Sequence, residues 1–93
     1  LRQGWRYEFV NSSYPTHPLQ FIDQTRQQPR MDDTVLVGQD DAGSLSGDTD
    51  LNLVENGGTF QLTIAGALVS DIQGYRCAIT NHANMRGTVN IMQ

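Results

Sequence analysis

This chain has 93 residues, enough for one small domain (1–93) with a modest core, because a chain of this length buries only about 60–65% of its unfolded surface. Its net charge is −4 and its six basic residues are scattered arginines, which argues against nucleic-acid binding, since phosphate contacts need clustered cations. No apolar run approaches the roughly 20 residues of a membrane span, and a single cysteine excludes an internal disulfide.

Short alternating or β-branched runs, separated by turn residues, predict strands along most of the chain. The first is Trp5–Val10, whose alternation puts Trp5, Tyr7 and Phe9 on one face. The further predicted strands, in chain order, are Pro18–Asp23, Thr34–Gly38, the alternating part of Asp50–Gly58, Thr59–Ile64, Tyr75–Ile79 and Thr88–Met92. We expect the last two strands to form a hairpin that is joined by the loop Thr80–Gly87.

The connections between these strands also carry a prediction. The turn residues Asn56-Gly57-Gly58 predict a tight hairpin between the fourth and fifth strands. Gln39–Thr49 is polar and Gly-rich, which predicts a surface loop, and Ala65–Gly74 predicts a single helical turn or a bend. The spacing of strands and turns indicates an all-β protein, either a β-sandwich or a small barrel.

The segment YRCAITNHANMRG contains the only cysteine, Cys77, together with His82 and Met85. Because Cys77 ends a predicted strand and the other two lie on the following loop, all three can converge at one end of the sheet. Thiolate, imidazole and thioether are soft or borderline donors, which suit copper. A blue-copper site needs one more imidazole, and the only other histidine is His17, where a loop meets a strand.

Each of these residues also has an ordinary structural interpretation. A lone cysteine such as Cys77 is usually a buried apolar filler, a loop histidine is usually solvated, and Met85 can be a core plug. A nucleophilic Cys–His pair is a further possibility, but no third orienting group stands at a recognisable spacing.

The segment YRCAITNHANMRGTVNI resembles the C-terminal copper loop of cupredoxins. The segment YEFVNSSYPTHPLQF is similar to the strand, Asn, loop and first copper histidine of that family, and FQLTIAGALVSDIQGYRC is similar to the stretch that leads to its cysteine. The resemblance covers most of the chain from Gly4 onward. It implies a small Greek-key β-sandwich and one copper ion, with His17, Cys77 and His82 as trigonal ligands and Met85 as the weak axial ligand.

Three features depart from the family pattern. Only two residues separate His82 from Met85, where the family usually has three or four, and we still expect Met85 to bind. Pro18 follows the first histidine, so that position has no N–H to donate toward the cysteine sulfur. Only 16 residues precede His17, which predicts that a full leading strand is absent here, supplied elsewhere or dispensed with. An absent strand would leave a sheet edge open to a second copy of the chain.

The resemblance implies an electron-transfer protein that cycles between Cu(I) and Cu(II) with redox protein partners. It does not imply an enzyme, since four protein ligands leave no open position. It also implies a location outside the cytoplasm, in the periplasm or at the cell exterior, either free or as part of a membrane-anchored parent. The sequence begins at Leu1 without a signal peptide, which predicts a mature or trimmed form. Two other functions stay open, namely a copper carrier and a metal-free β-sandwich interaction module.

Overall fold

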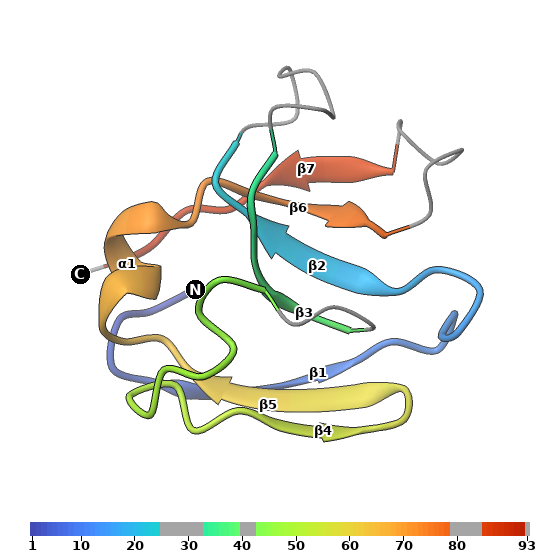
Figure 1. Cartoon of the computed structure of the whole chain (residues 1–93), viewed down its shortest axis with the longest axis horizontal. Coiled ribbons are helices and arrows are strands. Elements are labelled where there is room, and N and C mark those ends of the chain that lie inside the picture. Colours follow the sequence, from blue (N-terminus) through green and yellow to red (C-terminus); the bar gives the residue numbers. More distant parts are fainter. Residues whose placement is uncertain (25–32, 40–42, 79–84, 93) are drawn as a thin grey trace.

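The computed structural model describes residues 1–24, 33–39, 43–78 and 85–92. In these residues the chain forms two antiparallel sheets and one short helix, which confirms the prediction of a mostly β protein. Figure 1 shows the two sheets, with the four-stranded sheet in the upper part and the three-stranded sheet below it. No helix in the described ranges is long and apolar enough to cross a membrane.

The smaller sheet has the strand order β1-β5-β4, with bounds Arg6–Val10, Thr59–Thr63 and Val54–Asn56. The predicted hairpin between β4 and β5 is confirmed, and Gly57 in its turn has a φ of 59°, a conformation that favours glycine. The strand predicted from Asp50 begins only at Val54, because residues 49–51 form a turn that places Leu51 in the core.

The larger sheet has the strand order β3-β2-β6-β7, with bounds Val35–Gly38, Leu19–Ile22, Gly74–Cys77 and Arg86–Thr88. The hairpin of the last two strands is confirmed, but two of its predicted boundaries are wrong. β7 begins two residues earlier than predicted, because Arg86 and Gly87 pair with Arg76 and Tyr75 instead of belonging to the loop. It ends at Thr88, where the predicted strand begins. Downstream, Met92 makes only an isolated bridge.

Three phenylalanines join the sheets. The ring of Phe9 on β1 lies 5.0 Å from that of Phe60 on β5 and 5.2 Å from that of Phe21 on β2, measured between centroids. Phe60 is fully buried, as are Leu62, Ile64 and Leu68 around it. Leu68 comes from α1 (Ala67–Asp71), which confirms the predicted helical turn and closes one end of the core.

The three aromatic side chains of the first predicted strand divide between core and surface, with the larger share against the core. Tyr7 and Phe9 pack on the core, whereas Trp5 is 58% exposed and lies under the guanidinium of Arg2. The edge of β1 that faces away from β5 pairs with no other described strand. The Trp5 carbonyl accepts from the Ile64 N–H, and the Asn11 N–H donates to the Gly58 carbonyl, so the backbone groups at both positions face β5. Because these groups alternate in direction along an antiparallel strand, the N–H of Glu8 points to the outer edge.

Candidate metal centre

The larger sheet brings three of the four predicted ligands to one end. Cys77 is the last residue of β6, Met85 immediately precedes β7, and His17 lies two residues before β2. Because β2, β6 and β7 are neighbours in the sheet, the ends of these strands lie side by side. The fourth predicted ligand, His82, lies outside the described residues.

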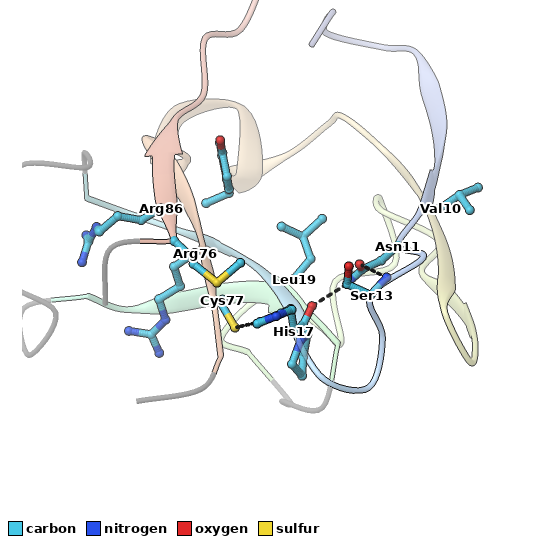
Figure 2. Close-up of a pocket in the computed structure, with 11 residues that line it drawn as sticks. Val10, Asn11, Ser13, His17, Leu19, Arg76, Cys77 and Arg86 are labelled. Carbon is cyan, nitrogen blue, oxygen red and sulfur yellow. Dashed lines mark hydrogen bonds between the residues drawn. The ribbon is translucent and has the colours of Figure 1, made fainter. Parts of the chain in front are cut away.

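Cys77 and His17 face each other directly. The Cys77 Sγ is 3.7 Å from Nδ1 of His17, and Figure 2 shows the imidazole pointing at the sulfur. Two ligands of one metal ion, with metal–sulfur and metal–nitrogen bonds of about 2.3 and 2.0–2.1 Å and a tetrahedral to trigonal angle, are separated by roughly 3.6–3.8 Å. The 3.7 Å contact is a hydrogen bond between the thiol and the imidazole, and its length also fits two ligands of one metal ion. Cys77 is only 5% exposed, so little of it is open to water.

Met85 lies opposite Cys77 on the neighbouring chain segment. The Cys77 N–H donates to the Met85 carbonyl at 2.8 Å, one step beyond the Arg76–Arg86 pair. Directly opposed residues of an antiparallel pair have their side chains on the same face, with Cβ atoms about 4.5–5.5 Å apart. Strand pairing therefore sets the position of Met85 relative to Cys77.

A cleft of about 470 Å³ opens beside these residues. Its polar wall includes His17 and Cys77, and its apolar wall includes Leu19, Tyr75 and Met85. Tyr75 is 40% exposed and Met85 44% exposed, although both are large side chains. The site therefore combines a buried thiol with an accessible mouth, at which the Tyr75 and Met85 side chains stand beside polar lining residues such as Asn11.

A hydrogen-bond network holds the backbone at His17. The Asn11 side-chain amide donates to the His17 carbonyl at 2.6 Å and to Oε1 of Gln39 at 2.9 Å. Gln39 is 2% exposed, and the same oxygen also accepts from the Leu19 N–H at 3.0 Å. Its amide donates to the Gly57 carbonyl at 3.2 Å, so one side chain joins the His17 segment to the turn of the other sheet.

The prediction that Gln39 belongs to a surface loop is therefore wrong. A glutamine that follows a short apolar run is typical of a loop. Gln39 is buried because the His17 segment and the β4–β5 turn pack around its side chain. Pro18 is buried, and its carbonyl accepts from the Ala78 N–H at 2.9 Å, which ties the His17 segment to the chain just beyond Cys77.

In the described part of the chain, no three His, Cys, Asp or Glu side chains gather into a group that could hold a metal ion. The predicted site also includes Met85, which is not one of these residue types, and His82, which lies outside the described residues. Comparisons with protein-family models, with curated proteins and with solved structures found no match for this chain. A functional hypothesis therefore depends on the donor types at this end of the sheet and on their geometry.

Proposed function

We propose that this chain is a mononuclear type 1 copper protein that transfers single electrons, with His17, Cys77, His82 and Met85 as the copper ligands. The observation that carries this proposal is the 3.7 Å separation of the Cys77 sulfur and the His17 nitrogen, two donors that are 60 residues apart in the sequence. Thiolate, imidazole and thioether together form the donor set typical of blue copper.

The fold is compatible with this function. Cys77 and Met85 flank the connection between β6 and β7, and the strand that follows His17 pairs with β6 on its other side. We propose that the two sheets form a cupredoxin-like Greek-key sandwich, in which no described strand pairs with the outer edge of β1. The larger sheet alone supplies the three described donors.

Copper bound at this site would supply one-electron chemistry between Cu(I) and Cu(II). The task of the chain is to hold the ligands in one arrangement in both states. Backbone pairing fixes Cys77 against Met85, and the bond from the Asn11 amide fixes the His17 carbonyl. The burial of Cys77 keeps water from the sulfur. A redox protein outside the cytoplasm would approach through the mouth of the cleft, where Tyr75 and Met85 are exposed.

Copper carriage is a second candidate, which the accessible cleft favours. A site that opens into about 470 Å³ beside a 44% exposed methionine gives an incoming donor protein room to reach the ion. A carrier would hold Cu(I), which is colourless, whereas an electron-transfer site would show the intense colour of a Cu(II)–thiolate bond.

The experiment is titration of the full chain with Cu(II) and with Cu(I), followed by visible and electron spin resonance spectra. We expect one copper per chain and an intense visible band that Cys77→Ser abolishes, with much weaker binding in His17→Ala. Met85→Leu should raise the reduction potential of the copper, and Met92→Leu is its matched control, because Met92 is also exposed and lies away from the cleft. An unchanged band in Cys77→Ser would end the proposal. Binding of Cu(I) alone would favour carriage, and no binding would favour a metal-free module.

A further inference from the structure

A buried ionic cluster lies on the opposite face of the strands that carry Cys77 and Met85. The Asp33 carboxylate is fully buried and binds two arginines, with Oδ2 2.9 Å from Nη1 of Arg76 and Oδ1 2.8 Å from Nη2 of Arg86. The two arginine side chains are only 14% and 6% exposed. Figure 2 shows both of them on the side of the strands away from His17.

Each arginine is the immediate neighbour of a proposed ligand. Arg76 precedes Cys77 on β6, Arg86 follows Met85 at the start of β7, and the two arginines are paired directly opposite each other. Like charges directly opposite each other in a sheet destabilise the pairing. The Asp33 carboxylate binds each guanidinium through one oxygen and so offsets their repulsion in this register.

Burial of three charges does little for overall stability, because the desolvation penalty is as large as the attraction, and apolar replacements are often equally stable. In some proteins, buried polar or ionic groups instead select one pairing register over the alternatives. A slip of β7 along β6 by one residue would turn Arg86 to the other face of the sheet, away from Asp33. A slip by two residues keeps the face but moves Arg86 by about 7 Å, out of hydrogen-bond reach.

We infer that Asp33 is a positioning residue that fixes the register of β6 and β7, and thereby sets Met85 opposite Cys77. The register in which both arginines reach Asp33 is the same one in which the Cys77 N–H meets the Met85 carbonyl. As far as it concerns copper, this inference rests on the function proposed above. The register itself is a property of the metal-free chain and is tested separately.

The first test is amide hydrogen exchange on the metal-free protein. Asn has the same shape as Asp, but in Asp33→Asn the side chain is uncharged. Its amide N–H₂ also places a donor against one of the arginine donors, so one of the two ion-pair contacts is lost. We expect the Cys77 amide to exchange about tenfold faster or more, because loss of one partner of a buried pair destabilises that region locally, while the Leu62 amide in the other sheet is unaffected. Glu8→Gln is the matched control, with the same change in charge at an exposed position of β1. Equal Cys77 protection in Asp33→Asn and Glu8→Gln overturns the inference, whether or not the protein binds copper.

A second variant covers the case in which Asp33→Asn does not fold. The triple variant Asp33→Leu, Arg76→Met, Arg86→Met carries no charge at the cluster and should fold, because apolar groups commonly replace a buried ion cluster without loss of stability. We expect it too to lose part of its Cys77 amide protection, since the charge pairing that favours this register is then absent. Full protection in the triple variant would show that the cluster does not set the register.

The second test uses the copper-loaded protein. If Asp33 acts through Met85, Asp33→Asn should change the spin-resonance spectrum and the reduction potential, and the spectral change should vanish in a Met85→Leu background. If Asp33→Asn changed the spectrum equally in the wild-type and the Met85→Leu protein, Asp33 would not act through Met85. Failure of the wild-type chain to bind copper would refute the proposed function and leave the exchange experiment to decide the role of Asp33.

Discussion

Replacement of Gln39 by methionine tests the network that holds His17. Methionine has a similar length and fills the same interior space, but it offers no hydrogen bond. Gln39 makes three such bonds, to the Asn11 amide, to the Leu19 N–H and to the Gly57 carbonyl, at 2.9, 3.0 and 3.2 Å. The substitution therefore removes the link between the His17 segment and the β4–β5 turn without creating a large cavity.

The expected loss of stability follows from these three bonds. At about 1 kcal/mol for each net hydrogen bond the loss is about 3 kcal/mol, and a buried donor left without a partner adds a further 1–3 kcal/mol. Gly57 is exposed, so water can replace the partner of its carbonyl, which lowers the sum. We expect a decrease of about 3–5 kcal/mol in the free energy of unfolding, a large part of the 5–15 kcal/mol that stabilises a typical domain.

Urea denaturation of the metal-free protein measures this change, and Gln73→Met is the control because Gln73 is exposed. We expect a lower midpoint for Gln39→Met at an unchanged slope, and a weaker affinity for copper, since the Asn11 amide that fixes the His17 carbonyl loses its second acceptor. A free energy of unfolding within about 0.5 kcal/mol of the Gln73→Met value would refute the reasoning, because changes of that size are ordinary at surface positions.

Four further predictions concern the core, the hairpin, the axial position and the open edge. Phe60→Ala should lower the free energy of unfolding by about 3–5 kcal/mol in calorimetry, because it empties the space between the two sheets. Gly87→Ala should destabilise by about 1–3 kcal/mol and displace the Tyr75 ring, which occupies the place of any side chain at 87; an unperturbed ring in the NMR spectrum would contradict this. Met85→Leu should keep the visible copper band and raise the reduction potential, whereas an equal potential would mean that Met85 only packs. Sedimentation should detect pairing of β1 between two copies, which Glu8→Pro blocks by removing the outward N–H, and a monomer at high concentration would speak against an open edge.

The hairpins were predictable because their signals are local. The alternation in Thr59–Thr63 and the glycines at the turn before it specify a strand and a tight reversal without reference to the rest of the chain. That Cys77 and Met85 lie near each other was predictable for a similar reason, since they are close in the sequence on either side of one connection. The pairing of β2 with β6, which brings His17 to Cys77, could be expected only through the resemblance to cupredoxins.

Tertiary structure alone decided the rest. The sequence offers Gln39 and Asp33 as polar residues beside short apolar runs, a pattern typical of exposed loops, yet both side chains are interior because segments distant in sequence close over them. The start of β7 at Arg86 also involves distant partners, since Arg86 is paired opposite Arg76 and both arginines bind Asp33. Local patterns record the preferences of neighbouring residues, whereas burial and ion pairing depend on which strands meet, and that is settled only when the whole chain packs.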